Sequence, residues 1–244
     1  MLNKMIKKIK ELIKENRANN NKIYLQTKEL EWANIFHDSI RGKKHIDDLG
    51  LNIGRWAGSY PFFYVLNRIL SDYCPSSILE FGLGESSKLI STYIENYIPN
   101  CQHIIIEQNE LWAIEFKNRF NLSKKSSIIF CELETQLVNG FEVNSYSNLE
   151  SKITNDFDLY IVDGPFGSPR FSRYDIVLLV ERFQKDKDFV VLFDDTNRDG
   201  EKDTLKEILL KLKNKNIKYY VGHYEGNKRV TLICSEKYIY LTSL

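Results

Sequence analysis

The sequence contains few cysteines and histidines, the residues that form the disulfides of small secreted domains and hold structural metals. Its 244 residues include four cysteines and four histidines, and no two cysteines form a C-x-x-C pair. We therefore expect neither a disulfide framework nor a zinc site, and a reducing cytoplasm is the default location. No apolar run approaches the roughly 20 residues of a membrane-spanning helix. The first segment also lacks the long apolar run and small-residue cleavage site of a secretory signal.

The chain also lacks an excess of either charge. The 34 lysines and arginines nearly balance 33 aspartates and glutamates, for a net charge of +1, so the composition gives no reason to expect a nucleic-acid partner. Hydrophobic residues make up 43% and charged residues 27% of the chain, which suits a folded domain with a full core. The length fits one α/β domain with an extension.

The N-terminal segment departs from this balance. Residues 1–22 carry seven lysines and arginines against two glutamates, and six apolar residues recur at helical spacing: Leu2, Met5, Ile6, Ile9, Leu12 and Ile13. The pattern predicts an amphipathic helix over 1–35, interrupted at the asparagines 19–21. Such a helix packs on its own domain, packs on a partner subunit in a homodimer, or lies on an anionic membrane surface. Packing is the more common outcome and is the expectation here.

The remainder of the chain divides into a loop and a regular domain. Residues 41–60 contain four glycines and are predicted to be a loop, with a candidate lid at 54–60. We therefore divide the chain into a helical extension with a lid loop, 1–58, and a main domain, 59–244.

Helices and strands alternate through the main domain. Strands are predicted at 77–81, 103–107, 127–131, 159–162, 189–193, 217–221 and 230–234, and helices at 62–73, 86–96, 110–120, 173–184 and 203–213. The first five strands are continuous apolar runs mostly separated by helices, which predicts a parallel sheet with helices on both faces. Only a short turn joins the last two strands, so one of them must run antiparallel. No element is predicted over 132–158.

The most informative segment spans residues 77–87. A short apolar strand contains Glu80, a Gly-x-Gly turn follows at Gly82 and Gly84, and Ser86 and Ser87 open the next helix. The glycines allow a turn and a close approach of the backbone to a ligand, and the serines can cap the helix. Serine stands where a dinucleotide-binding fold places its third glycine, and an acid before the turn suits a cationic cofactor.

Acidic residues follow three further strands. Glu107 ends the second predicted strand, Asp163 the fourth, and Asp194 and Asp195 the fifth. Because ligands bind parallel sheets outside the carboxyl ends of the strands, we expect these side chains at one site. An acid in the position of Glu107 can hold the two hydroxyls of a ribose.

The segment from Glu80 to Ser86 resembles the first motif of the class I S-adenosylmethionine-dependent methyltransferases, and Glu107 and Asp163 match their acids after the second and fourth strands. The resemblance implies a Rossmann-like, seven-stranded, mostly parallel sheet with a reversed C-terminal strand. It also implies S-adenosylmethionine as the cofactor, held by Glu80, Gly82, Gly84, Ser86, Ser87, Glu107, Asp163 and, near the adenine, Glu132.

A narrower resemblance covers 162–175 and 193–202, which look like a bacterial subgroup associated with surface-polysaccharide biosynthesis. It implies O-methylation of a sugar or sugar-linked small molecule, as in capsule or lipopolysaccharide synthesis. The association is one of context rather than chemistry.

The resemblance also suggests roles in catalysis. Acids after the fourth and fifth strands hold a divalent cation in metal-dependent O-methyltransferases, so Asp163, Asp194 and Asp195 are candidate ligands for Mg²⁺ or Mn²⁺. Thr196 and Pro165 depart from those families' patterns, which puts the metal in doubt. Asp163 and His223 are candidate general bases. Arg170 and Arg173 are candidates to bind a phosphate or carboxylate of the acceptor.

Three other functions remain open at this point. The first is a small-molecule N-methyltransferase, which would need no metal. The second is an NAD-dependent nucleotide-sugar oxidoreductase, which would use the same glycine turn for a different cofactor. The third is a non-catalytic, methyltransferase-like scaffold, which would bind its ligand without turnover.

Overall fold

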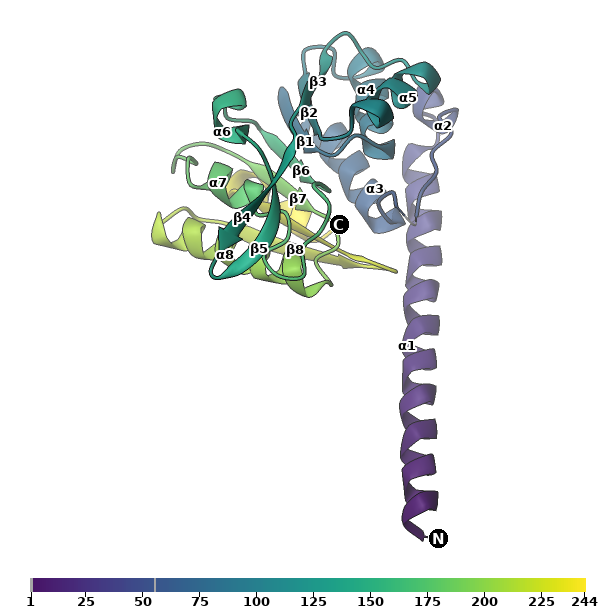
Figure 1. Ribbon diagram of the computed structural model, residues 1–244. Helices are drawn as coiled ribbons and strands as arrows, with labels where there is room; N and C mark the ends of the chain where they lie inside the picture. Colours follow the sequence, from purple (N-terminus) through teal and green to yellow (C-terminus); the bar gives the residue numbers. More distant parts are fainter. Residues whose placement is uncertain (1, 55) are drawn as a thin grey trace.

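The chain folds around one seven-stranded sheet (Figure 1). The computed structural model describes residues 2–54 and 56–244; Met1 and Arg55, the latter in the predicted lid, lie outside the described residues. The strands of the sheet are β1 (Ser77–Phe81), β2 (Gln102–Glu107), β3 (Ser126–Phe130), β6 (Leu159–Val162), β7 (Val190–Phe193), β8 (Tyr220–Glu225) and β9 (Arg229–Cys234).

The order of the strands is β3-β2-β1-β6-β7-β9-β8. The pairs from β3 through β7 are parallel, whereas β9 runs antiparallel to both β7 and β8. This confirms the predicted Rossmann-like, mostly parallel sheet with a reversed C-terminal strand. The order reverses direction beside β1, between β2 on one side and β6 on the other, which is where such sheets bind ligands.

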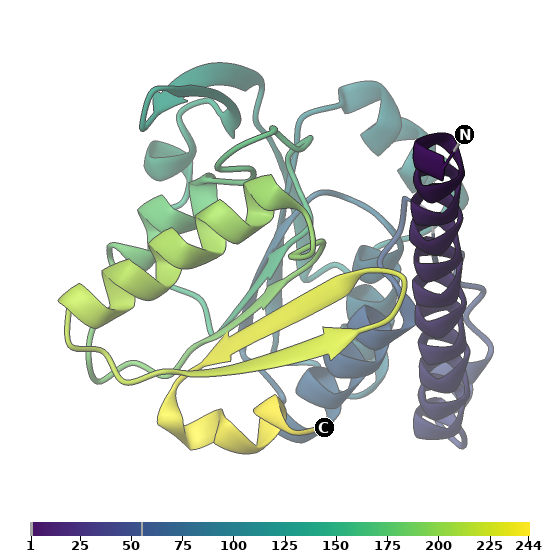
Figure 2. The ribbon, with the colours of Figure 1, turned by 90° about the horizontal axis from the view of Figure 1, so that it is seen from below.

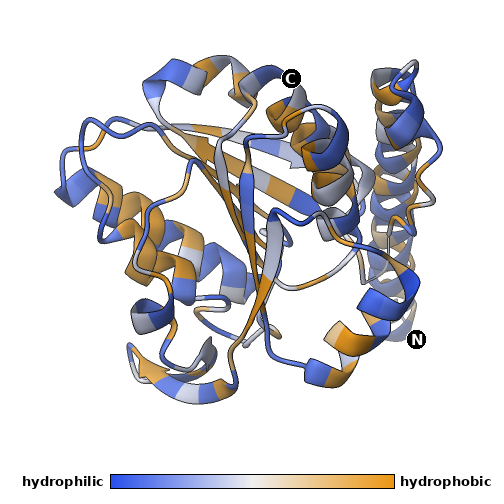
Figure 3. Ribbon diagram, turned by 90° about the horizontal axis from the view of Figure 1, so that it is seen from above, coloured by the Kyte–Doolittle hydropathy of each residue, from blue (hydrophilic) through white to orange (hydrophobic). Residues whose placement is uncertain are grey.

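Helices cover both faces of the sheet. They are α2 (Lys44–Asp47), α3 (Tyr60–Arg68) with its continuation η1 (Ile69–Tyr73), α4 (Glu85–Asn96), α5 (Glu110–Arg119), α6 (Leu149–Lys152), α7 (Asp175–Val180), α8 (Asp199–Asn214) and η2 (Glu236–Thr242). Alternate strand residues enter opposite cores: Ile78 packs with α3 and α4, and Leu79 with α7 and α8. Both faces are therefore apolar, and the central strands are largely orange in Figure 3.

A hairpin occupies the region for which no element is predicted. Strands β4 (Leu133–Val138) and β5 (Phe141–Tyr146) pair with each other and form a separate two-stranded sheet. Asn139 and Gly140 join them, with positive φ angles of 51° and 85°. Asn-Gly between two strands is the strongest short-range sequence signal for a hairpin, so this element was present in the sequence and was missed.

Helix α1 (Leu2–Ile40) is a single helix of 39 residues, so the predicted interruption at 19–21 is wrong. Asparagine disfavours helix by less than about 0.7 kcal/mol per residue relative to alanine, and three such residues do not end a long helix. Its C-terminal part packs on α3, with Phe36 and Ile40 buried in the core.

The N-terminal half of α1 leaves the domain altogether. It extends well beyond the sheet in Figure 1 and stands beside the domain when viewed almost along its axis in Figure 2. Residues 4–24 are all exposed, so this segment does not pack on its own domain, which was one of the two kinds of packing expected; packing on a partner subunit stays a prediction. Even so, no helix in the described part of the chain has an apolar stretch that would cross a bilayer.

Candidate active site

A cavity of about 730 Å³ opens at the carboxyl ends of β1, β2, β6 and β7. The loop before α3 closes one side of it, and the start of α5 lies on another. Its lining includes most of the acids predicted to meet at this edge, together with aromatic and basic side chains: Gly82, Gly84, Glu85, Ser86, Glu107, Trp56, Trp112, Phe166, Asp163, Asp195, Arg173, Arg198 and Lys228.

Two glycines let the loops after β1 and β6 touch. Gly82 has φ +95°, a conformation that L side chains rarely adopt. A Cβ on Gly164 would lie 3.1 Å from the backbone nitrogen of Gly82 and 2.6 Å from Oη of Tyr146. The close approach places Asp163 beside the glycine turn, so the two motifs share one cavity wall.

Glu80 supports the turn from below. Its buried carboxylate accepts hydrogen bonds from the hydroxyls of Ser86 and Ser87, the latter at 2.7 Å, and one of its oxygens lies 3.0 Å from Nε2 of His103. It is not among the residues that line the cavity. Glu80 therefore holds the first turn of α4 in place, and its charge lies behind the turn.

Glu107 lines the cavity and is itself held firmly. Its carboxylate accepts backbone hydrogen bonds from Leu83 at 3.0 Å, Gln108 at 2.9 Å and Asn109 at 2.7 Å. Oε1 accepts two of these bonds and Oε2 accepts one. Because each carboxylate oxygen has two lone pairs, Oε2 can still accept one further hydrogen bond, such as one from a ribose hydroxyl. The strand end that carries Glu107 is thus tied to the glycine turn, as a shared binding site requires.

Several lining residues were not anticipated. Gln108, Asn109 and Trp112 follow Glu107, and the indole Nε1 of Trp112 donates to the carbonyl of Leu83 at 2.8 Å. An aromatic residue five positions after the acid that was expected to bind a ribose was the available signal. Across the cavity, the backbone nitrogen of Asn52 donates to Glu85 at 2.9 Å, which holds the predicted lid loop against the turn.

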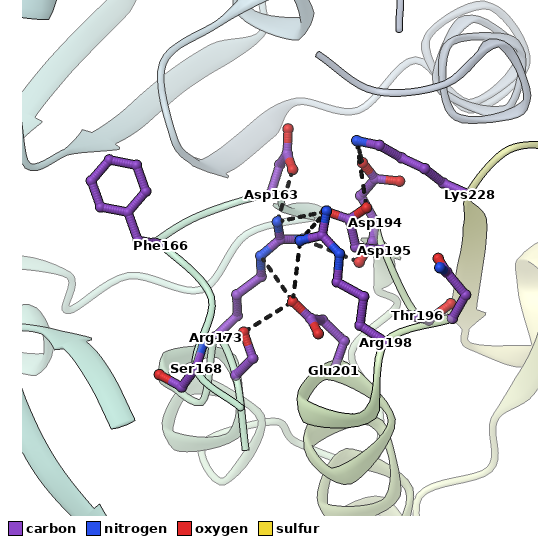
Figure 4. Close-up of polar contacts among 12 residues, drawn as sticks. Asp163, Phe166, Ser168, Arg173, Asp194, Asp195, Thr196, Arg198, Glu201 and Lys228 are labelled. Carbon is purple, nitrogen blue, oxygen red and sulfur yellow. Dashed lines mark hydrogen bonds and ion pairs between the residues drawn. The ribbon is translucent and has the colours of Figure 1, made fainter. Parts of the chain in front are cut away.

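The acids after β6 and β7 converge with basic side chains (Figure 4). Asp163, Asp194 and Asp195 can each place one oxygen within 4.8 Å of the others. Arg173 lies among them, with its guanidinium 3.2 Å from Asp163 and 3.0 Å from Asp195. From the turn between β8 and β9, Lys228 approaches Asp194 and Asp195, each at 3.4 Å. Arg173 and Lys228 thus offset part of the negative charge of the three acids.

Burial controls the protonation of this cluster. Burial raises the pKa of Asp163 to about 7, although Arg173 opposes the shift. Burial also raises the pKa of Asp194. Burial disfavours the charge on Lys228, but Asp194, Asp195 and Asp163 outweigh it and hold the pKa of the lysine above its usual value. Lys228 is therefore charged at neutral pH, and Asp163 can exchange a proton there.

The backbone is strained at two of these positions. Asp195 has φ +61° and Arg173 has φ +58°, in the left-handed region that costs other residues of order 1 kcal/mol or more. Strain of this kind persists where the surrounding structure imposes it, and it gathers at functional sites. In both residues it accompanies a side chain directed into the acid cluster.

A divalent ion fits this cluster poorly. Buried oxygens Asp194 Oδ1 and Asp195 Oδ1 have no hydrogen-bond partner among the described residues, which favours an added cation. Against it, a guanidinium and a charged ammonium already lie 3.0–3.4 Å from the same carboxylates. An ion among the three acids would directly face Lys228, and we judge that repulsion to be the larger effect.

Three of the predicted site residues lie elsewhere. Arg170 pairs with Asp203 and lies over the ring of Phe141, at 4.7 Å from its centroid. His223 lies within β8, where its Nδ1 is 3.0 Å from the hydroxyl of Thr231. Glu132 is exposed between β3 and β4. None of the three lines the cavity, and neither do the buried Glu80, Ser87 and Asp194. Arg198 and Lys228, which were not predicted, do line it.

No protein-family model matches this sequence, and no curated protein matches it either. Solved structures resemble it at low identity. The O-methyltransferase TomG of Streptomyces achromogenes, solved with S-adenosylmethionine, is 15% identical, with a TM-score of 0.48 over 84% of this chain and 89% of its own.

Two further structures give comparable matches. The Podospora anserina methyltransferase PaMTH1, bound to S-adenosylhomocysteine, is 12% identical, with a TM-score of 0.46 over 90% of this chain and 95% of its own. A Bacillus cereus O-methyltransferase with S-adenosylhomocysteine is 13% identical, with a TM-score of 0.44 over 85% and 89%. At these values the matches carry no argument about chemistry, which has to rest on the cavity itself.

Proposed function

We propose that the protein is an S-adenosylmethionine-dependent O-methyltransferase that acts on a sugar or a sugar-linked small molecule. The observation that carries the proposal is the composition of one cavity. The glycine turn and Glu107 line one part of it, and Asp163, Lys228 and Arg198 line another. The first part suits an adenosine with its ribose, and the second suits a hydroxyl that must lose a proton.

When bound, S-adenosylmethionine would supply an electrophilic methyl group; transfer to the acceptor oxygen would break its sulfur–methyl bond, leave S-adenosylhomocysteine and release the hydroxyl proton. The chain has to bring the acceptor into line and exclude water from the reacting atoms, since orientation alone removes much of the barrier. Asp163 accepts the proton, because a carboxylate with a pKa of about 7 is matched to a reaction near neutral pH. The positive charge of Lys228 stabilises the negative charge that develops on the acceptor oxygen.

We further propose that this chemistry needs no divalent ion. Arg173 and Lys228 already offset the charge of the three acids, so Mg²⁺ or Mn²⁺ would enter only by displacing the chain's own cations. Metal-free turnover is also what an N-methyltransferase would show, so the nature of the acceptor atom has to be tested separately.

The acceptor side of the cavity favours a ring with polar substituents. Trp56 is 93% exposed and Phe166 is 60% exposed, although both line the cavity. Aromatic faces at a cavity mouth offer flat apolar surface for the C–H face of a sugar. Arg198 is half exposed beside Asp195 and Glu201, and we assign to it the recognition of a phosphate or carboxylate that was expected of Arg170 and Arg173.

Calorimetry and thermal shift with three ligands test the cofactor. We expect S-adenosylhomocysteine and S-adenosylmethionine to bind and to raise the melting temperature, and NAD to do neither. Stabilisation by NAD alone would identify an oxidoreductase instead. Release of S-adenosylhomocysteine should then be measured against sugars, sugar nucleotides and small amines; turnover on amines alone would favour N-methylation, and binding without any turnover would favour a scaffold.

A further inference from the structure

The exposed half of α1 carries an apolar stripe, which we define as Met5, Ile6, Ile9, Leu12 and Ile13. Each of these side chains is 41–56% exposed. At 3.6 residues per turn, all five fall within about 120° of the helix circumference. A continuous apolar face left open to water on a projecting helix indicates a surface with a partner.

Basic residues surround this stripe on the rest of the helix. Lys8 borders it on one side, Lys10 and Arg17 border it on the other, and Lys4, Lys7 and Lys14 lie opposite. Residues 4–22 are exposed, and residues 1–22 carry seven basic residues against two glutamates. Lysine and arginine stems can lie along an apolar surface while their charged ends remain in water.

The stripe is too short for a stable helix pair. It stops at Asn16, Asn19 and Asn20, so it spans less than two heptads, whereas a coiled coil usually needs three to four. Ile23, Tyr24 and Leu30 are also exposed and lie on the same side of the helix, but the asparagines separate them from the stripe. Two copies would in addition bring together two segments of the same positive charge, which disfavours their pairing.

An anionic lipid surface complements both features at once. We propose that the N-terminal half of α1 lies in the interface of a membrane rich in anionic phospholipids, with the apolar stripe facing the acyl chains and the lysines facing the headgroups. The contacts of α1 with the domain begin near Glu29, so the first helical turns can bind a surface without disturbing the fold. This inference does not depend on the proposed reaction.

Vesicle sedimentation of the full chain tests the proposal. The vesicles contain phosphatidylcholine alone, or phosphatidylcholine with roughly a third phosphatidylglycerol, at low and high salt. We expect binding only to the anionic vesicles, and less of it at high salt. Each basic residue near the surface contributes about fivefold to the partition coefficient, so Lys8→Gln with Lys10→Gln, the two lysines that border the stripe, should lower it roughly 25-fold.

Two further variants separate insertion from charge alone. Ile9→Gln with Leu12→Gln should abolish most binding while leaving the net charge unchanged. Lys124→Gln with Lys125→Gln removes the same charge from exposed positions outside α1 and should bind as the wild type does. All three double variants should keep the melting temperature and the S-adenosylhomocysteine affinity of the wild type, because none changes a buried residue.

Binding that both α1 variants weaken and the Lys124/Lys125 variant does not would support the proposal. Failure of the wild type to sediment with anionic vesicles would overturn it, as would equal binding by all variants. A dimer in analytical ultracentrifugation that the Ile9/Leu12 variant dissolves, without any vesicle binding, would assign the stripe to a second copy of the chain and would also overturn it.

Discussion

Replacing Arg173 by methionine should destabilise the protein severely, because this one side chain compensates several buried acids. Its guanidinium lies 3.2 Å from Asp163, 3.0 Å from Asp195 and 3.9 Å from Glu201. It also donates to the carbonyl of Asp194 at 3.1 Å. Removing one partner of a buried ion pair costs about 3–5 kcal/mol, since the remaining charge is left unpaired in a poorly solvated place.

The expected cost is large enough to measure without ambiguity. For a chain of this length, the unfolding entropy per residue converts 3–5 kcal/mol into a fall in melting temperature of about 6–10 °C. Arg170→Met is the matched control, because Arg170 comes from the same loop but is half exposed and pairs with Asp203 at the protein surface end of its side chain rather than with several buried acids. A pair whose cation is half exposed is screened by water and contributes less than a fully buried one, so the control should lose clearly less stability than Arg173→Met.

The cost of Arg173→Met should also depend on pH. Burial already raises the pKa of Asp163 to about 7, and removal of Arg173 should raise it further. A carboxyl whose folded pKa exceeds its unfolded value of about 3.9 binds its proton more tightly in the folded state, so stability falls as pH rises between the two values. The difference from the wild type should therefore be largest near pH 8 and should shrink toward pH 5.

Calorimetry of the two variants and the wild type at pH 5, 6.5 and 8 would check this reasoning. A variant Arg173→Met that melts with Arg170→Met at every pH would refute it. So would a loss of stability that stays constant across the range, because the cost would then come from packing rather than from unpaired carboxylates.

Three further predictions concern the reaction. The kcat should rise as pH increases through about 7 and then level off, because Asp163 must be deprotonated to accept a proton; Asp163→Asn should lose this activity. Glu107→Gln should weaken S-adenosylhomocysteine binding at least about tenfold in calorimetry, whereas Glu110→Gln, at the exposed start of α5, should not. Turnover should continue in EDTA, and electron paramagnetic resonance should show no Mn²⁺ bound to the wild type. Mn²⁺ binding to the wild type would instead support a metal-dependent reaction, as would turnover that is lost in EDTA and regained with Mn²⁺.

The central sheet could be predicted from the sequence because its strands are buried on both faces. Segments such as β6 and β7 are continuous apolar runs, and each is followed by an acid that marks the functional edge. The antiparallel end of the sheet was predictable for a similar reason, since the short turn near Gly226 leaves no room for a crossover helix.

Other elements were missed because most of their sequence is ambiguous without tertiary contacts. Ile217 was predicted to begin a strand, but it is a buried connector that packs below α8, and β8 starts at Tyr220. The hairpin β4–β5 carries mixed polar and apolar residues, and its regular spacing is weak apart from the Asn-Gly turn.

The composition of the acid cluster depends on the path of the chain, which the sequence does not reveal. Asp163 and Asp195 were expected together because both follow parallel strands. Lys228 comes from a turn between two strands and meets them only because β9 is inserted beside β7. Arg173 turns inward where the backbone takes a left-handed conformation that no local residue preference would suggest.

Glu29 determines how far the N-terminal helix can be shortened. Its carboxylate accepts from the backbone nitrogens of Tyr60 at 2.7 Å and Asn227 at 2.8 Å, and the indole of Trp32 donates to the carbonyl of Glu225 at 3.0 Å. These contacts brace the turn that carries Lys228. A chain that starts shortly before Glu29 should lose only the projecting part of α1. A chain that starts after α1 should also lose the contacts that hold Lys228 beside the acids.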